Sequence, residues 1–325
     1  MINTSNKLSQ IISIINNISN DLLINDSPKT LYSPINYHLL NQGKRTRSIL
    51  CLLSFNLFND RLIDCKELIL AIDSLHEFTL IHDDIMDSAT VRRGQATINT
   101  KWSDNQAILS GDVVLIKAFQ HLLSLPKFNK YLLNHFTEIA IKICEGQQID
   151  MDMQQKTTIA LKDYLHMINL KTGALIQFSL VSPAILLGLN NNVIIKLRHI
   201  GMYIGQLFQI QDDYLDIYGQ YSSTGKTIGI DIRERKKTFL YFKAINLMSK
   251  KNKDRFIVLY NSLDPDKIEQ VLLCYNNLGI QKLILEEINK IYNKINLLIH
   301  EIPNCSLANR NLLVEFITHI LQREK

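Results

Sequence analysis

The chain has 325 residues, of which 46% are hydrophobic and 21% are charged, and its net charge is +5. These values are those of ordinary globular proteins, so they exclude a disordered or collagen-like chain, and the small positive charge indicates no nucleic-acid surface. The five cysteines are widely spaced and form no CxxC pair. This spacing argues against a zinc site and a disulfide framework, and it favours reduced thiols in the core.

Apolar residues recur every three or four positions along most of the chain, as at Leu68, Ile72 and Leu75, which is the helical period. No hairpin turn signal joins two alternating runs. The pattern predicts helices at 5–24, 34–58, 65–89, 102–124, 128–152, 160–189, 192–218, 237–250, 265–276, 279–300 and 307–323. Two polar interruptions, 88–99 and 219–237, carry glycines and basic residues. Because nothing resembles a linker, we predict a single all-α domain spanning residues 1–325.

The location of the protein is predicted from what the sequence lacks. The N-terminus shows no basic region followed by an apolar run and a cleavage site, so we expect a cytoplasmic protein. No stretch reaches the ~18 uninterrupted apolar residues of a membrane span. The most apolar one, 180–189, is broken by Ser182, Pro183 and Gly188. We therefore expect no stable membrane insertion.

Two acidic clusters share the spacing Asp-Asp-x-x-Asp, and each follows an apolar run at the end of a predicted helix. The first trio is Asp83, Asp84 and Asp87, and the second trio is Asp212, Asp213 and Asp216. Like charges one helical turn apart repel, and the C-terminal end of a helix disfavours anions, so stability alone would not select these residues. Carboxylates without nearby metal-spaced Cys or His favour Mg²⁺. A lone trio would be a solvated helix end, but two copies favour a metal-dependent site.

Basic residues form clusters at 43–47, 92–94, 171–172, 225–226 and 236–238. Lys and Arg are common phosphate ligands, although any one of these clusters alone would be surface charge. Two further patterns resemble a P-loop and a zinc-protease motif, but their spacing excludes both. The glycines at 219 and 225 are separated by five residues instead of four and follow a helix, unlike a P-loop. His76 and His82 are six positions apart, unlike the histidines of a zinc protease.

The order of these motifs resembles that of the trans-prenyltransferases, the polyprenyl diphosphate synthase family. The markers are Gly43–Arg47, in which the second arginine comes one residue early, then His76, the first trio, 92–94, 111–112, 146–147, 171–172, 208–209, the second trio and 225–236. Arg235 and Leu240 depart from the family pattern, which often has Gly and Pro there. The resemblance implies an all-α bundle around a deep apolar cavity, with the two trios facing each other at its mouth, and a homodimer.

The resemblance also implies roles for individual residues. Three Mg²⁺ ions would bind the allylic diphosphate through Asp83, Asp87 and Asp212, supported by Asp84, Asp213 and Asp216. The cations expected on the same diphosphate are Arg92, Lys171, Lys226 and Lys236. Those expected on isopentenyl diphosphate are Lys44, Arg45, His76 and Arg93, and Thr172 and Gln209 would lie along the forming carbocation. The expected reaction is head-to-tail condensation of isopentenyl diphosphate with an allylic diphosphate, driven by electrostatic stabilisation.

The product length is predicted from Phe78, which precedes Asp83 by five residues and lies about 7.5 Å lower on the same helix. A large ring at that depth can form a floor for the growing chain, although at an arbitrary site it would simply pack in the core. The resemblance implies that one bulky residue here, followed by a smaller one such as Thr79, marks short-chain synthases. We expect geranylgeranyl diphosphate, ahead of farnesyl diphosphate and longer chains.

Two other functions compete with this interpretation. A class I terpene cyclase also ionises a diphosphate at Asp-Asp-x-x-Asp, but its second motif is usually of Asn/Ser/Glu type, and Lys44, Arg45 and Arg93 would have no second diphosphate to bind. A non-catalytic subunit of a heteromeric synthase would be expected to lack one trio, whereas both are intact here.

Overall fold

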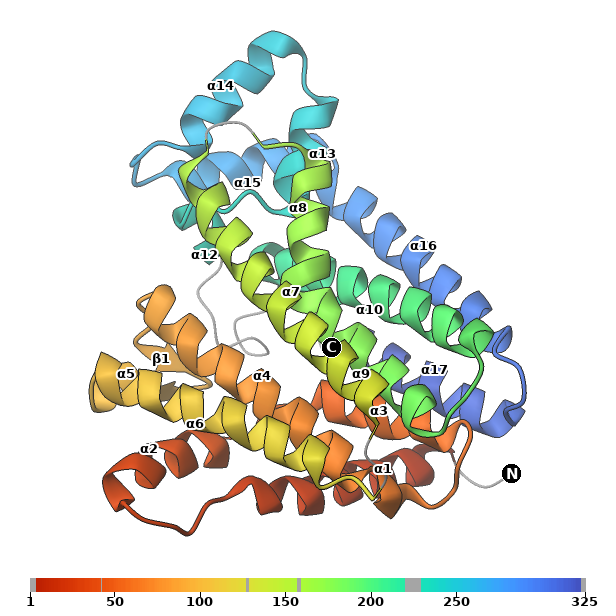
Figure 1. The fold of residues 1–325 in the computed structure, drawn as a ribbon. Helices are drawn as coiled ribbons and strands as arrows, with labels where there is room; N and C mark the ends of the chain where they lie inside the picture. Colours follow the sequence, from red (N-terminus) through yellow and green to blue (C-terminus); the bar gives the residue numbers. More distant parts are fainter. Residues whose placement is uncertain (1–3, 42, 127–128, 157–158, 220–228, 323–325) are drawn as a thin grey trace. The chain divides into compact units, whose positions relative to one another are not determined.

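The computed structural model describes residues 4–41, 43–126, 129–156, 159–219 and 229–322. Its regular structure is almost entirely helical, which confirms the predicted all-α class (Figure 1). Residue contacts group the chain into two compact units. Unit 1 contains Met1–Ile143, Leu175–Gly201 and Ile302–Val314, and unit 2 contains Cys144–Ala174, Met202–Glu301 and Glu315–Lys325. The single domain over 1–325 stays a prediction.

Unit 1 is built around helix α4 (Lys66–Met86), which ends in the first trio. The other helices wholly inside it are α1 (Thr4–Ser19), α2 (Lys29–Leu40), α3 (Thr46–Asn56), α5 (Ile98–Lys101) and α6 (Asp104–Leu123), with 3-10 turns at Asn20–Leu22 and Leu62–Cys65. Parts of α7 (Lys130–Gln155), α9 (Ala174–Leu186), α10 (Asn191–Tyr218) and α17 (Leu307–Leu321) complete it. Helix α4 packs along α6 (Figure 1). Leu68, Ile72 and Leu75 are fully buried, as their periodicity predicts.

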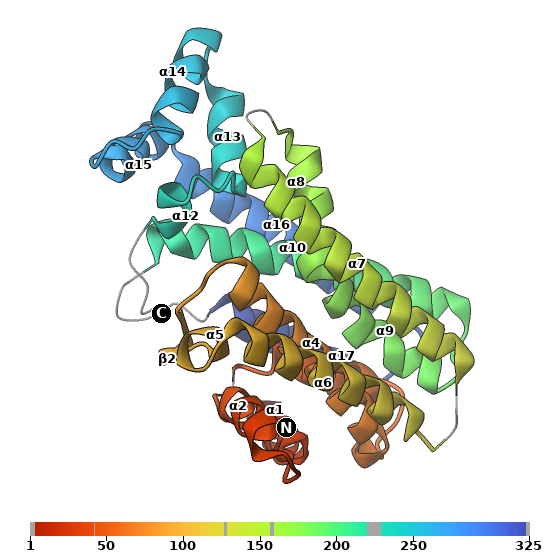
Figure 2. The same ribbon diagram turned by 60° about the vertical axis from the view of Figure 1, so that its left-hand side comes forward.

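Unit 2 contains the second trio at the end of α10. Its other elements are α8 (Leu161–Ile168), a π-helical turn (Asn169–Gly173), α12 (Ile230–Arg233), α13 (Phe239–Leu247), α14 (Lys250–Tyr260), α15 (Lys267–Asn277) and α16 (Ile280–His300). Helices α13, α14 and α15 pack together (Figure 2) around a cluster of buried aromatic rings that includes Tyr241, Phe256 and Tyr260. This cluster anchors the segment before α13, because the Tyr260 hydroxyl donates a 2.5 Å hydrogen bond to the carbonyl of Lys236.

Several predicted helix boundaries are wrong. The expected helix 34–58 is two helices, α2 and α3, because the chain leaves helical geometry at Asn41 and Arg45 adopts a left-handed φ of 47°. The expected helix 160–189 contains the π turn. Helix α14 was not expected, because its first turn is Lys-Lys-Asn-Lys and shows no apolar period.

The interruption at 88–99 contains a short antiparallel hairpin, so the expectation of no hairpin is wrong there. Strand β1 (Val91–Arg92) pairs with β2 (Gln95–Ala96). The connecting residues Arg93 and Gly94 have φ of 51° and 76°, the left-handed pair that two-residue hairpins use. Strands of two residues are too short to show an alternating pattern.

All five cysteines are free thiols, but only Cys51 and Cys65 are buried. Cys144 is exposed, and Cys274 and Cys305 are partly exposed, so the expectation that all five lie in the core is wrong for these three. None of the helices in the described part of the chain is both long enough and apolar enough to cross a membrane.

Candidate active site

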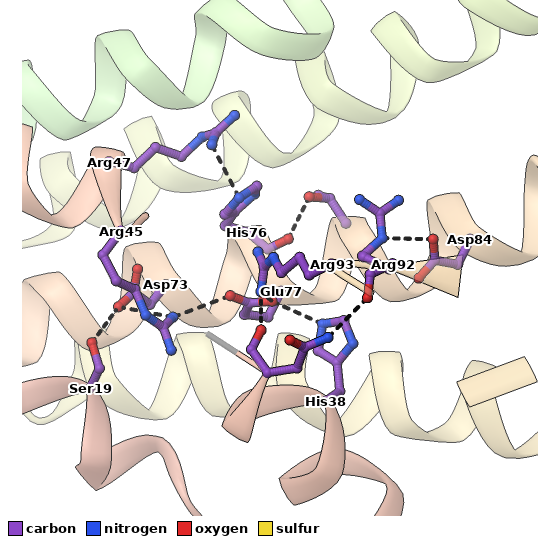
Figure 3. Close-up of polar contacts among 12 residues, drawn as sticks. Ser19, His38, Arg45, Arg47, Asp73, His76, Glu77, Asp84, Arg92 and Arg93 are labelled. Carbon is purple, nitrogen blue, oxygen red and sulfur yellow. Dashed lines mark hydrogen bonds and ion pairs between the residues drawn. The ribbon is translucent and has the colours of Figure 1, made fainter. Parts of the chain in front are cut away.

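The first trio places its carboxylates in two different environments at the end of α4. Asp84 is buried, and its Oδ1 accepts a 2.7 Å hydrogen bond from Arg92 Nε (Figure 3). Burial raises the pKa of Asp84, and the Arg92 guanidinium opposes that rise. Asp83 is partly exposed, with Oδ2 4.0 Å from Arg92 Nη2, and Asp87 is exposed. The protein therefore holds the middle carboxylate, whereas the first and last, one turn apart, lie toward solvent.

The middle carboxylate of the second trio is likewise held by the protein. Asp213 is buried, and its carboxylate accepts hydrogen bonds from the Phe239 N–H (2.8 Å), from Gln209 Nε2 (3.1 Å) and from the Tyr164 hydroxyl. Burial raises the pKa of Asp213 to about 6, although these hydrogen bonds act in the opposite direction. Asp212 is exposed.

Asp216, the last member of the second trio, fixes the start of α12. Its two carboxylate oxygens accept hydrogen bonds of 3.1 Å each from the backbone N–H groups of Ile230 and Asp231. Burial and the neighbouring carboxylates of Asp216 and Asp213 raise the pKa of Asp231 to about 7. Negative charge is therefore costly at this end of α10, and hard carboxylate oxygens gathered in this way suit a divalent cation such as Mg²⁺. Within the described ranges, no three His, Cys, Asp or Glu side chains already converge on one ion position.

Lys171 and Thr172 lie in the π turn, a distortion that often marks functional positions in helices. Lys171 Nζ is 2.7 Å from Asp150 Oδ2. Thr172 Oγ1 donates to Gln209 Oε1 at 3.3 Å, and Gln209 in turn donates to Asp213. Helix α7 runs close to this turn, because a Cβ atom at Gly146 would lie 2.3 Å from the backbone nitrogen of Lys171. Unit 2 thus brings the predicted Lys, Thr and Gln together with the second trio.

Lys236 precedes α13 and is partly exposed. Its Nζ is 2.7 Å from Glu234 Oε2 and 3.8 Å from Asp231 Oδ1. Burial would lower the pKa of Lys236, but these acidic neighbours outweigh burial and raise it. Arg235 has a φ of 61°, a left-handed conformation that glycine adopts without strain and that a residue with a side chain rarely adopts. Lys226 lies outside the described residues.

Arg45, His76 and Arg93, three of the residues expected on isopentenyl diphosphate, lie together along α4 in unit 1 (Figure 3). Lys44 is exposed, whereas Arg45 is buried, with Nη1 3.2 Å from Glu77 Oε1 and 3.5 Å from Asp73 Oδ2. Arg93 Nη1 lies 3.7 Å from Glu77 Oε2. The structure therefore places Arg45 in a buried ion-pair network.

Arg47 was not among the predicted site residues, yet it lies next to His76. Its Nη1 donates a 3.1 Å hydrogen bond to His76 Nε2, which assigns the lone pair to that ring nitrogen. Burial lowers the pKa of Arg47 to about 10 and holds the pKa of His76 well below its ordinary value, so His76 is neutral. The sequence did contain the relevant signal, since Arg47 ends the same basic run as Lys44.

Phe78 and Thr79 are both partly exposed on α4. The Phe78 ring lies edge-on to the ring of His82, with centroids 4.7 Å apart, and Thr79 Oγ1 donates a 2.7 Å hydrogen bond to the carbonyl of His76. Their role in chain length stays a prediction. The first trio belongs to unit 1 and the second to unit 2, so the expected facing of the two trios also stays a prediction.

Comparison with known families identifies the class of enzyme to which these clusters belong. The model of the polyprenyl synthetase family matches residues 28–278. The chain belongs to the polyprenyl synthetase family. It is accordingly a prenyltransferase, which confirms the enzyme class and the family expected from the motifs.

Relatives of this polyprenyl synthetase include archaeal enzymes. It is 37% identical to a geranylgeranyl pyrophosphate synthase of Geoglobus acetivorans over 71% of this chain and 73% of that protein. It is 34% identical to a short chain isoprenyl diphosphate synthase of Methanothermobacter thermautotrophicus over 78% of each chain. Among solved structures, a geranylgeranyl pyrophosphate synthase superposes with a TM-score of 0.90 at 31% identity, covering 98% of this chain and 99% of the other.

Proposed function

We propose that this chain condenses isopentenyl diphosphate head-to-tail with an allylic diphosphate and that its product is geranylgeranyl diphosphate. The observation that carries the proposal is the duplicated trio, in which the middle carboxylate is buried and held by protein groups while the first one, Asp83 or Asp212, is at least partly exposed. The relatives support a short-chain product, because several of them are geranylgeranyl diphosphate synthases at 33–37% identity.

Mg²⁺ is the proposed cofactor, with Asp83 and Asp87 holding it on one cluster and Asp212 and Asp216 on the other. When bound, Mg²⁺ withdraws charge from the leaving diphosphate. Asp84 and Asp213 support these ligands through their own hydrogen bonds. Asp84 accepts from Arg92, and Asp213 accepts from Gln209 and from the Phe239 N–H. Three ions, as the family resemblance implies, remain part of the proposal.

The remaining residues act directly on the substrates. Arg92, Lys171 and Lys236 bind the allylic diphosphate and neutralise the charge that builds up as its C–O bond breaks. Lys226 shares this proposed role. The Thr172 hydroxyl and the Gln209 amide, already paired with each other, direct their dipoles along the allylic cation. The isopentenyl double bond attacks that cation, and a proton is lost to the released diphosphate.

Isopentenyl diphosphate is proposed to bind Lys44, Arg47, His76 and Arg93. Arg47 replaces Arg45 as the direct ligand, because the Arg45 guanidinium is buried between Asp73 and Glu77 whereas Arg47 lies beside His76. A neutral His76 can still donate from Nδ1 to a phosphate oxygen. Arg45 then supports the site through its ion pair with Glu77.

Product analysis tests the proposed reaction. Purified protein is incubated with Mg²⁺, labelled isopentenyl diphosphate and each of the C5, C10 and C15 allylic diphosphates, and the dephosphorylated products are separated by chromatography. We expect a C20 alcohol from every starter. Failure to incorporate label would contradict the reaction itself, and a cyclic hydrocarbon formed without isopentenyl diphosphate would establish the terpene cyclase alternative. A C15 or longer main product would contradict only the chain length.

The chain-length assignment has its own test in Phe78→Ala. Removing the ring should let the chain pass the floor, so we expect products longer than C20 while the metal-binding carboxylates stay unchanged. Thr79→Ser, which keeps a small hydroxyl at the neighbouring position, is the matched control and should keep the wild-type product. An unaltered product distribution for Phe78→Ala at normal activity would mean that the stop lies elsewhere.

We also propose a homodimer that packs along α6. Leu109, Ile116 and Leu123 recur at seven-residue intervals and are 54% to 60% exposed, a stripe typical of a helix that packs on another helix. The expected mass in light scattering is about twice 37.5 kDa, and Ile116→Glu should halve it by placing a charge in the contact. A wild-type mass of 37.5 kDa at micromolar concentration would refute the dimer.

The cytoplasm is the proposed compartment. The five cysteines are free thiols, as is typical of proteins in a reducing environment. Fractionation of cells that express the native gene tests this, and recovery of the protein with the membrane or secreted fraction would contradict it.

A further inference from the structure

We propose that Glu77 is a positioning residue that holds the cations of the isopentenyl diphosphate site in place. The inference rests on the proposed function, in which Lys44, Arg47, His76 and Arg93 bind that diphosphate. Glu77 follows His76 directly and belongs to none of the motifs identified in the sequence. Its surroundings in unit 1 assign the role.

Glu77 contacts side chains from three other segments, α2, the residue before α3 and the hairpin turn (Figure 3). The side chain is 2% exposed. Its Oε2 lies 2.9 Å from His38 Nε2 on α2 and 3.7 Å from Arg93 Nη1 in the hairpin turn, and its Oε1 accepts a hydrogen bond from Arg45 Nη1 at 3.2 Å. Burial would raise the pKa of Glu77, but the His38 hydrogen bond and the surrounding positive charges outweigh it and keep the pKa below its ordinary value. Glu77 is therefore an ionised carboxylate at the centre of a cationic cluster.

Arg93 shows how Glu77 orients a cation. Its Nη1 donates a 2.7 Å hydrogen bond to the carbonyl of Asn41, and Asn41 Nδ2 donates to the Arg92 carbonyl at 3.0 Å, which ties the hairpin to the end of α2. A Cβ atom at Gly43 would lie 2.7 Å from Arg93 Nη2, so the guanidinium lies directly against the Gly43 backbone. The backbone therefore limits where the Arg93 side chain can go, and Glu77 supplies the charge that holds it there.

The charge balance explains why a carboxylate is required. Three guanidinium groups, those of Arg45, Arg47 and Arg93, gather around two carboxylates, those of Asp73 and Glu77. Glu77 also favours the charged form of Arg47 against its burial. A buried guanidinium without a counter-ion is costly and turns toward solvent. One net positive charge remains after this pairing, and a diphosphate can neutralise it.

Asp73 offers a matched comparison one turn earlier on α4. It is as buried as Glu77, and it lies 3.5 Å from Arg45 Nη1. Asp73 also accepts hydrogen bonds from the hydroxyls of Ser19 and Ser48, which belong to α1 and α3 and not to the hairpin. A purely structural carboxylate in this position should therefore affect stability without affecting the Arg93 guanidinium.

The test compares Glu77→Gln with Asp73→Asn by steady-state kinetics, varying each substrate in turn. For Glu77→Gln we expect the KM for isopentenyl diphosphate to rise about tenfold, because the charge that orients Arg93 is lost, while the KM for the allylic diphosphate stays within twofold. For Asp73→Asn both KM values should stay within twofold. Thermal unfolding of both variants shows that the measured enzyme is folded. Equal effects of the two substitutions on the isopentenyl diphosphate KM would overturn the proposal.

A double-mutant cycle with Arg93→Ala separates positioning from general damage. If Glu77 acts through Arg93, Glu77→Gln should change the Kd for isopentenyl diphosphate less than twofold in the Arg93→Ala background, whereas additive effects would contradict the coupling. The Kd is measured by titration calorimetry without the allylic substrate. Calorimetry measures binding without turnover. An enzyme that binds isopentenyl diphosphate but makes no product would therefore contradict the proposed reaction, whereas the measured coupling between Glu77 and Arg93 would still hold. If Glu77→Gln does not fold, Glu77→Asp retains the charge at a shorter reach, and an unchanged Kd there would overturn the proposal.

Discussion

Replacing Asp212 by alanine is expected to lower turnover by at least ~10²–10³-fold at saturating Mg²⁺, the loss typical of removing one strong electrostatic stabiliser. Asp212 is exposed, so the fold should not depend on it. Asp83→Ala should behave in the same way, because Asp83 is the corresponding outer carboxylate of the first trio. Turnover is measured by incorporation of labelled isopentenyl diphosphate, and thermal unfolding reports the fold.

Asp104, the first residue of α6, is an exposed aspartate outside both trios and is the matched control for the loss of one exposed carboxylate. Asp104→Ala should leave turnover within twofold. If Asp212→Ala and Asp83→Ala kept near-wild-type turnover with Mg²⁺ at saturation, the proposed metal-binding assignment of the outer carboxylates would be wrong.

Asp213→Ala is expected to act mainly on stability, lowering the free energy of unfolding by about 3 kcal/mol. The substitution leaves the Phe239 N–H, the Gln209 amide and the Tyr164 hydroxyl without their buried acceptor. The loss should be smaller than the sum for three isolated bonds. Burial already makes the charge of Asp213 costly, as its raised pKa of about 6 indicates, and removing the residue relieves that cost.

Tyr164→Phe provides the graded control, because it removes a single hydrogen bond to Asp213 and should cost about 1 kcal/mol. Urea unfolding followed by circular dichroism measures both variants. Wild-type stability for Asp213→Ala, or destabilisation of Asp212→Ala by a similar amount, would contradict the division of the trio into outer and middle carboxylates.

Most of the helical architecture could be predicted from apolar periodicity, because a helix that buries one face must repeat its apolar residues every three or four positions. Helix α4 and its buried Leu68, Ile72 and Leu75 follow that rule. The end of α2 at Leu40, the start of α3 at Thr46 and the hairpin at 91–96 did not follow from the pattern. Their geometry depends on left-handed φ values at Arg45 and Arg93, which a single residue's identity does not specify.

The cation site could also be predicted only in part from the sequence. A basic run from Lys44 to Arg47 indicated anion binding, but the sequence could not tell which arginine is buried and which lies beside His76. Arg45 precedes the first residue of α3, whereas Arg47 lies in the first turn of that helix, so helical spacing does not relate the directions of their side chains. The left-handed φ at Arg45 then directs that guanidinium toward Asp73 and Glu77.

The sequence by itself determined the helical class, the family and the two trios, because each depends on periodicity or on the order of residues along the chain. Only the tertiary structure decided what each aspartate does. Asp83 and Asp87 share a helix face, whereas Asp84 is rotated by about 100° and meets Arg92, which folds back from the hairpin. Asp213 likewise meets Tyr164 and Phe239, residues far from it in sequence. Helical spacing fixes the angle between neighbouring carboxylates, but only packing sets whether that angle points to solvent or to a buried hydrogen-bond donor.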